Sequence, residues 1–185
     1  MKRLTPMLVV VLALVVAAPV FGFGKGLESG APSKWENIQV GITYRLYQPG
    51  NTLGFKLNKI KAISCGKGHE PWVAATYGGY KGILGSKAKG FALYEGHPIC
   101  SNAAESSAIK GDPPVRIMGA AVRVGVYCSL GKACTVDQGV KNGFTLTWKA
   151  KPSSPYKKNT NMQLDSSHLT LVQVLKFAGK LKKVG

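Results

Sequence analysis

Residues Val115 to Cys128 read VRIMGAAVRVGVYC and give the clearest indication of the fold class. In its second half, apolar residues alternate with Arg123, Gly125 and Tyr127, and this period of two is typical of a half-buried strand. It is the longest strand that the sequence predicts. We therefore expect a β-rich fold in which one face of this strand points toward the core.

The residues on either side predict more strands of the same kind. Asn142 and Gly143 predict a hairpin turn, and the run after them alternates Phe144, Leu146 and Trp148 with polar residues. Shorter alternating runs predict strands at 40–47, 53–57, 60–63, 72–77, 90–94 and 162–164, a bulge near 60, and a polar loop at 151–161. Glycine supplies 23 of 185 residues, roughly 12% against the usual ~7%, which indicates many turns.

One helix is predicted, near the end of the chain. Thr170 has the position of an N-cap, and Gln173 three residues later completes a capping-box pattern. Leu169 and Val174 are spaced for a hydrophobic staple across this start. The apolar face of the helix comprises Leu171, Val174, Leu175, Ala178 and Leu181. Strands followed by a helix predict an α+β fold, with a mostly antiparallel twisted sheet and one C-terminal amphipathic helix packed on it.

The first residues predict export. A basic start from Met1 to Arg3 precedes an uncharged apolar run at 8–20, LVVVLALVVAAPV, and small residues follow it. This is the pattern of a secretory signal, and the run is shorter than the ~20 residues of a membrane span. We therefore divide the chain into a signal peptide at 1–22, a flexible lead-in at 23–36 and a single β-rich domain at 37–185. The expected location is secreted or extracytoplasmic, in the periplasm or cell envelope, with an uncleaved signal anchor as the alternative.

Four cysteines, an even number in a chain expected to be exported, predict two disulfides. Cys128 and Cys134 are separated by five residues around Gly131, a spacing that a sharp turn can bridge. That leaves Cys65 with Cys100, and we prefer this pairing to the two crossed ones.

The same part of the chain allows a metal or catalytic interpretation. Cys65, His69, His97 and Cys100 are four residues of the kinds that close a tetrahedral zinc site. If the two cysteines are bridged, His69, Glu70 and His97 remain as a weak metal site or as the site of a small secreted hydrolase or metal-dependent enzyme. A cysteine nucleophile with a histidine base is a further alternative. No hydrolase, metalloprotease or phosphate-loop motif occurs, so we predict no catalytic residue and no cofactor.

The charge of the chain predicts an anionic partner. Lys and Arg number 25 against 8 Asp and Glu, and removal of 1–22 leaves 23 against 8, a formal charge of +15. Nearly all of this charge is lysine, which attracts anionic surfaces diffusely and is poorly suited to recognising nucleic-acid bases. The predicted partner is an anionic envelope polymer or lipid surface, although a basic surface that keeps the protein in solution is the simpler interpretation. The candidate anion-binding residues are Lys176, Lys180, Lys182 and Lys183.

The last part of the chain resembles a known group of domains. The segment from Leu164 to Lys183, LDSSHLTLVQVLKFAGKLKK, is similar to the closing segment of bacterial extracytoplasmic domains of unknown function. The likeness is carried by Leu169, Leu171, Leu175, Ala178, Leu181 and Val184. Some of these domains resemble the curved sheet-plus-helix fold of lipoprotein-carrier and sigma-regulator sensor proteins. The resemblance implies a non-enzymatic sensing or binding domain. The function expected is therefore binding, either of an anionic envelope component or of an apolar ligand held under the sheet.

Overall fold

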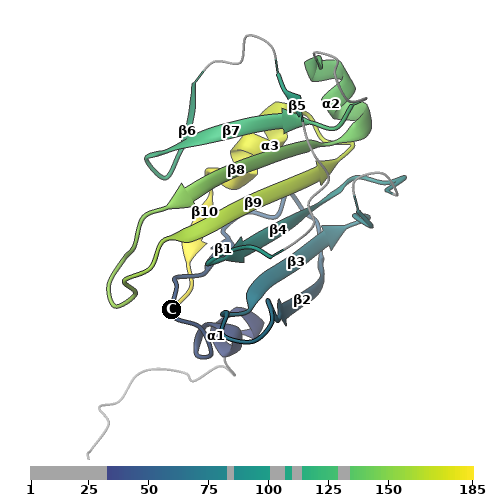
Figure 1. Ribbon diagram of the computed structural model, residues 1–185. Coiled ribbons are helices and arrows are strands. Elements are labelled where there is room, and N and C mark those ends of the chain that lie inside the picture. The colour runs from purple at the N-terminus through teal and green to yellow at the C-terminus, as the bar shows by residue number, and fades with distance from the viewer. Residues whose placement is uncertain (1–32, 83–85, 101–106, 110–113, 129–133) are drawn as a thin grey trace, which may run out of the picture. The chain divides into compact units, whose positions relative to one another are not determined.

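The structure is a computed structural model that describes residues 33–82, 86–100, 107–109, 114–128 and 134–185 (Figure 1). The predicted signal peptide and the first ten residues of the predicted lead-in, 23–32, lie outside the described residues. In chain order the elements are α1 (Lys34–Gln39), β1 (Tyr47–Pro49), β2 (Leu57–Ile63), β3 (Trp72–Gly78), β4 (Gly90–Gly96), β5 (Ser107–Ala108), β6 (Val115–Ile117), β7 (Ala120–Val126), α2 (Val136–Asn142), β8 (Phe144–Ala150), β9 (Thr160–Ser167), α3 (Leu171–Ala178) and β10 (Leu181–Lys183).

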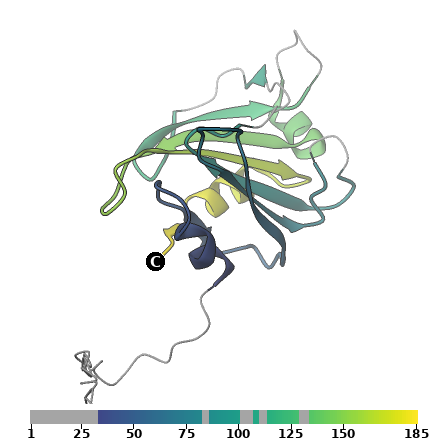
Figure 2. The ribbon, with the colours of Figure 1, turned by 60° about the horizontal axis from the view of Figure 1, so that its bottom comes forward.

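An eight-stranded antiparallel sheet forms the centre of the fold. Its strand order is β2-β3-β4-β9-β8-β7-β5, with β6 paired to the free part of β7. Strands β1 and β10 form a separate two-stranded antiparallel ribbon. Figure 2 shows α1, α3 and the ribbon on the same side of the large sheet. The predicted α+β class, with a mostly antiparallel sheet and a C-terminal helix packed on it, is confirmed.

The main core lies between the sheet and α3. Alternate residues of the central strands point toward the helix, and the Phe177 ring lies 4.0 Å from that of Phe91, centre to centre. Phe91 in turn stacks on Tyr77 at 4.6 Å. Burial of each such ring contributes about 1.5–3 kcal/mol. The predicted capping box is present, because Thr170 Oγ1 accepts from the Gln173 N–H and the Gln173 side chain accepts in return. The ring contacts attach α3 to the sheet, and the capping box fixes its first turn.

The stretch from Val115 to Cys128 is a hairpin, and the prediction of one long strand is wrong. Strands β6 and β7 pair with Ile117 opposite Ala120, and the turn between them is Met118 and Gly119. Both turn residues have positive φ, 53° and 77°, as the two-residue turns that match strand twist require. The predicted alternation holds on β7 alone.

The predicted hairpin at Asn142 and Gly143 is also wrong. Asn142 is the last residue of α2, and Gly143 caps that helix with φ 109°. The start of α2 is a capping box between Thr135 and Gln138. The connection between β7 and β8 is therefore a short helix, closed by a glycine that takes a conformation other residues avoid.

Two differences concern the ends of the described chain. α1 begins inside the predicted lead-in, where Ser33 and Glu36 form a capping box and Trp35 is buried. Of the predicted strand at 40–47 only Tyr47 belongs to a strand. At the other end the helix stops at Ala178, so Leu181 lies on β10 and not on α3.

The remaining predicted strands are present with adjusted limits. Strands β3 and β4 cover the runs at 72–77 and 90–94, while 53–57 contributes only the first residue of β2. The bulge predicted near 60 lies between Leu57 and Lys59. The run at 162–164 is the middle of β9, an eight-residue strand at the centre of the sheet.

Candidate anion-binding surface

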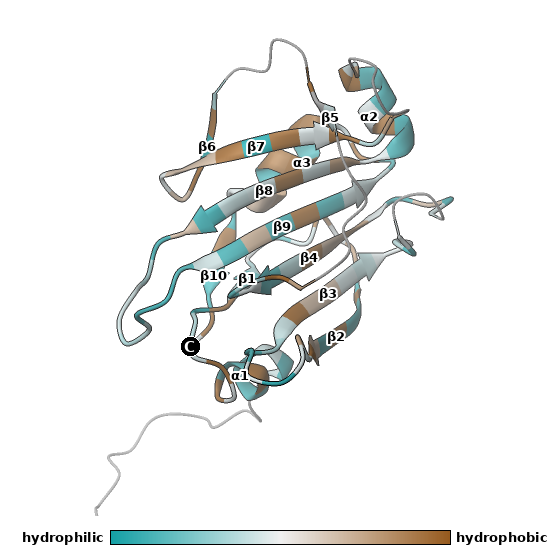
Figure 3. Ribbon diagram, in the orientation of Figure 1, coloured by the Kyte–Doolittle hydropathy of each residue, from teal (hydrophilic) through white to brown (hydrophobic). Residues whose placement is uncertain are grey.

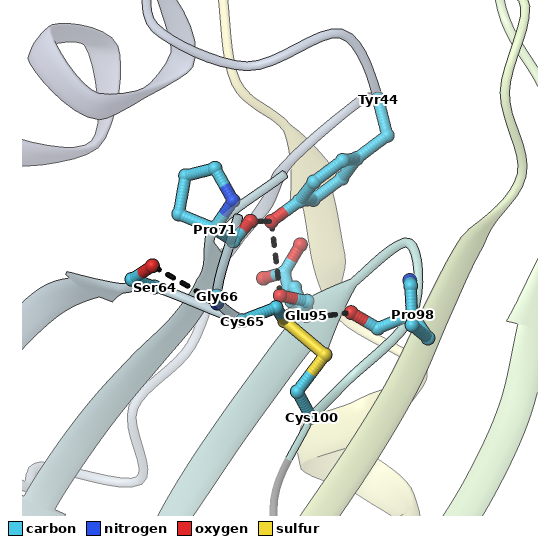
Figure 4. Close-up of a disulfide and its surroundings, with 8 residues drawn as sticks. All are labelled: Tyr44, Ser64, Cys65, Gly66, Pro71, Glu95, Pro98 and Cys100. Carbon is cyan, nitrogen blue, oxygen red and sulfur yellow. Dashed lines mark hydrogen bonds between the residues drawn. A yellow bond between two sulfur atoms is a disulfide. The ribbon is translucent and has the colours of Figure 1, made fainter. Parts of the chain in front are cut away.

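Both predicted disulfides are present. Cys65 joins Cys100 across the ends of β2 and β4 (Figure 4), and Cys128 joins Cys134 between β7 and α2. Because these thiols are bonded to one another, they are not available as zinc ligands or as nucleophiles. The four-residue zinc set and the cysteine nucleophile are therefore excluded.

His69 and His97, two other candidate metal or catalytic residues, form hydrogen bonds that hold loops in place. His97 Nδ1 donates to the Asn159 carbonyl oxygen at 2.9 Å, and this bond places the proton on Nδ1. The His69 backbone N–H donates to Gly66 O at 3.4 Å, in the loop between β2 and β3. Within the described ranges, no group of three or more His, Cys, Asp and Glu side chains is placed to hold a metal ion.

Glu70 connects the chain before β1 to the connection between β8 and β9. Its Oε1 accepts a hydrogen bond from Thr43 Oγ1 and lies 3.3 Å from Lys158 Nζ. Burial raises the pKa of Glu70, but the hydrogen bonds from Thr43 and Lys158 and the lysine charge together hold that pKa below its usual value. Glu70 is therefore an ionised anchor for the connection at 151–159.

Arg45 holds the same connection from the inside. This buried side chain donates through Nη1 to Val184 O at 2.6 Å and Gly185 O at 3.0 Å, and through Nη2 to Ser154 O at 2.9 Å. Its guanidinium also lies over the Tyr156 ring. One residue thus fixes the start of the connection and the segment after β10 relative to each other.

The four lysines predicted to bind anions lie on α3, on β10 and in the connection between them. Lys176 is in the last turn of α3, Lys180 follows the helix, and Lys182 and Lys183 lie on β10. All four are exposed, but the single helical cluster that the sequence suggested is wrong because the helix ends before Lys180. On β10, Lys183 pairs with Tyr47 of β1 and Lys182 with Gln48.

The structure adds lysines that sequence reasoning missed. The connection at 151–159 carries three of them, and Figure 3 shows hydrophilic residues along this connection and on β10. We define the lysine surface as the exposed residues Lys151, Lys157, Lys158, Lys182 and Lys183. The signal for the additional members is the polar run KPSSPYKKNTN, which was predicted to be a loop and carries several lysines.

Two cavities open on this surface. The smaller, about 190 Å³, is lined by Tyr47, Met118, Ala150, Lys151, Pro152, Ser153 and Lys183. The larger, about 430 Å³, is lined by Gln39, Val40, Ile42, Thr43, Pro155, Tyr156, Lys157 and Lys158. Each combines two ammonium groups with hydroxyl and apolar walls, a combination that suits an oxyanion.

Little negative charge is available to neutralise these lysines. Five carboxylate side chains fall in the described ranges, and two of them, Glu95 and Asp165, are buried. The Lys158–Glu70 pair is the only ion pair between side chains of the described residues. The surface charge on this part of the molecule is therefore more positive than the count of acidic residues suggests.

Glu95 lies on the sheet face that carries the core. It is fully buried, its Oε2 accepts from the Tyr47 backbone N–H at 2.8 Å, and its Oε1 has no partner among the described residues (Figure 4). Burial raises the pKa of Glu95 well above its usual value. This carboxyl therefore adds less negative charge to the molecule than its formal count.

Asp165 lies on the opposite face, at the centre of β9. Its oxygens accept from Thr145 at 2.7 Å, from Gln163 at 3.1 Å, from Tyr127 at 3.3 Å and from Tyr80 at 3.5 Å. Burial raises its pKa, although the four donors oppose that effect. Because its acceptor sites are occupied by the protein, we assign Asp165 a structural role.

Comparisons with family models, with curated proteins and with solved structures found no match for this chain. Among the described residues, no helix is both long and apolar enough to cross a membrane. Two disulfides are typical of proteins that fold outside the reducing cytosol, which favours an extracellular or extracytoplasmic protein.

Proposed function

We propose that this chain is an exported, non-enzymatic binding protein that docks through its lysine surface to an anionic polymer of the cell envelope. Export would follow from the signal peptide expected at 1–22. The alternative ligand, an apolar molecule held under the sheet, is disfavoured because the rings of Tyr77, Phe91 and Phe177 fill the space below the central strands.

The observation that carries the proposal is the gathering of four lysines, Lys151, Lys157, Lys158 and Lys183, from two segments around two cavities, with one carboxylate partner among them. A polymer with repeated negative charges contacts several such lysines at once, so weak single attractions add together. At physiological salt, attraction extends only about 8 Å, so the separate lysines act locally on the bound polymer.

The test uses phosphorylated dextran, immobilised on a sensor, with neutral dextran as the reference surface. Binding of the full chain should weaken about tenfold or more between about 0.05 M and about 0.5 M salt. Binding that is absent, or that does not respond to salt, would contradict the proposal.

A pair of variants locates the interaction. Lys157→Gln with Lys183→Gln removes one charge from each of the two cavities, and we expect about a fivefold loss of affinity. The matched control, Lys59→Gln with Lys61→Gln, removes the same charge from exposed positions on edge strand β2 and should change affinity less than about twofold. Equal losses in both variants would mean that net charge alone drives binding.

A further inference from the structure

We propose that the smaller cavity of the lysine surface is a specific pocket for a phosphate monoester group. The inference rests on the proposed function and deepens it, because it names the chemical group that the anionic ligand presents. A pocket of this kind would bind one chemical group selectively, whereas exposed lysines alone attract any polyanion.

Four separate segments build the pocket. Tyr47 and Lys183 face each other across the β1–β10 ribbon, and Met118 comes from the β6–β7 turn. Lys151 and Ser153 belong to the connection that leaves β8. The adjacent residue of this connection is held in place by Arg45, which donates to Ser154 O at 2.9 Å. The two lysines, although distant in sequence, therefore line one cavity whose walls are fixed by the fold.

Ser153 supplies the observation that points to a ligand. Its Oγ is buried beside the Tyr47 phenol, yet it makes no hydrogen bond of ordinary length and angle within the described structure. A buried hydroxyl without a partner is unfavourable, so such groups commonly serve a bound water, ion or ligand. An oxyanion in the cavity would accept from this hydroxyl and from the two ammonium groups.

The donors favour phosphate over carboxylate. The cavity, about 190 Å³, has room for one phosphate group. Lys151, Lys183 and Ser153 offer donors from three positions on the wall, and no carboxylate lines the cavity. A phosphate monoester has three free oxygens to match three donors, whereas a carboxylate has two.

The experiment compares two dextrans of equal charge density, one phosphorylated and one carboxymethylated. The full chain should bind the phosphorylated polymer about fivefold more tightly or better, because only phosphate satisfies all three donors. Lys151→Gln and Ser153→Ala should each remove most of this preference, while Ser153→Thr, which keeps the hydroxyl, should retain it. Lys59→Gln is the control of equal charge and should leave the preference unchanged.

The outcomes separate the two proposals. Equal, salt-sensitive binding of both dextrans, or a preference that survives Ser153→Ala, would overturn the pocket and leave the lysine surface standing. Absence of binding to either polymer would overturn both. Vesicles with phosphatidic acid, a monoester, compared with phosphatidylglycerol, a diester, test whether a lipid headgroup serves as the source, and a preference for the former supports the pocket. Unchanged thermal unfolding of each variant establishes that it is folded.

Discussion

The guanidinium carbon of Arg45 lies 4.4 Å from the centre of the Tyr156 ring. The same guanidinium donates to backbone oxygens on two other segments, so a single buried cation joins the β8–β9 connection to the end of the described chain. A cation over an aromatic face is attractive, and hydrogen bonds to a charged group are stronger than neutral ones. The arrangement of the lysine surface therefore depends on a residue that is itself buried.

Replacing Arg45 tests this dependence. Arg45→Lys keeps the charge but cannot reach three oxygens with a planar fork, so we expect a loss of about 2–4 kcal/mol in the free energy of unfolding. Urea denaturation measures it. The exposed residue Arg123 provides the control, since Arg123→Lys should cost less than about 0.5 kcal/mol. Similar losses in the two variants would show that the buried contacts of Arg45 contribute little.

Because Glu95 is buried, we predict that the free energy of unfolding falls as pH rises. Its pKa in the folded state lies well above the ordinary 4.5, so between these values the folded protein binds a proton that the unfolded chain has released. The contribution is fully present below about pH 4.5 and is lost as pH rises through the folded-state pKa. Glu95→Gln keeps an acceptor for Tyr47 and removes this titration. The variant should therefore gain stability relative to the natural chain as pH increases.

Urea denaturation from about pH 4 to pH 9 checks this sign. Asp165, whose pKa burial also raises, contributes in the same direction and leaves some slope in the variant. Glu70 provides the opposite case, because its pKa is lowered and its contribution is lost as pH falls. Glu70→Gln should lower stability at neutral and alkaline pH, where the Glu70 contacts are formed, and should therefore show a smaller further loss in acid than the natural chain. A Glu95→Gln curve parallel to that of the natural chain would contradict the assignment.

Local sequence patterns predicted the elements whose conformation depends mainly on residues close together in the chain. The alternation of β3 and β4 and the Thr170 capping box needed no distant partner. The preferred disulfide pairing came from the short Cys128–Cys134 spacing, which left Cys65 with Cys100. The run at 40–47 misled for a physical reason. Ile42, Tyr44 and Leu46 are all buried, but an extended segment packed on a core alternates in the same way even where it makes only an isolated bridge, here between Tyr44 and Lys158.

The candidate site could not be read from local patterns. Lys151 and Lys183 line one cavity only because β10 returns to pair with β1, a contact between distant parts of the chain. Likewise β9 inserts between β4 and β8, which places Leu164 opposite both Leu93 and Leu146. The capping box of Thr135 and Gln138 indicated the α2 helix, but the Asn142–Gly143 pair at its end is also typical of a hairpin turn, and the hairpin was predicted instead.

The two disulfides should contribute unequally to stability. The chain-entropy relation gives about 4 kcal/mol for the Cys65–Cys100 separation of 35 residues, because a long loop is constrained. For the Cys128–Cys134 separation of 6 the same relation gives about 2 kcal/mol. We expect double Cys→Ser variants to lose stability in that order, measured by urea denaturation of the oxidised proteins. The reverse order would show that effects other than loop closure dominate.

At Gly139 we expect an exception to the usual gain in stability from replacing a helical glycine with alanine. Glycine to alanine inside a helix normally stabilises by about 1 kcal/mol. In α2, however, a Cβ at this position would lie 2.7 Å from Phe144 Cδ1 and closer still to Cε1 and Cζ. Phe144 is fully buried and has no room to move. We therefore expect Gly139→Ala to destabilise the protein by about 1–2 kcal/mol, because overpacking outweighs the gain in propensity.

A double-mutant cycle isolates the cause. Phe144→Leu shortens the side chain that the new methyl group would strike, so Gly139→Ala should cost less in that background than in the natural chain. Gly41→Ala is the matched control, since its Cβ would meet only Ile38 O at 3.7 Å, an ordinary contact, and the change should stay within about 0.5 kcal/mol. An equal cost of Gly139→Ala in both backgrounds would place the strain elsewhere than at the aromatic ring.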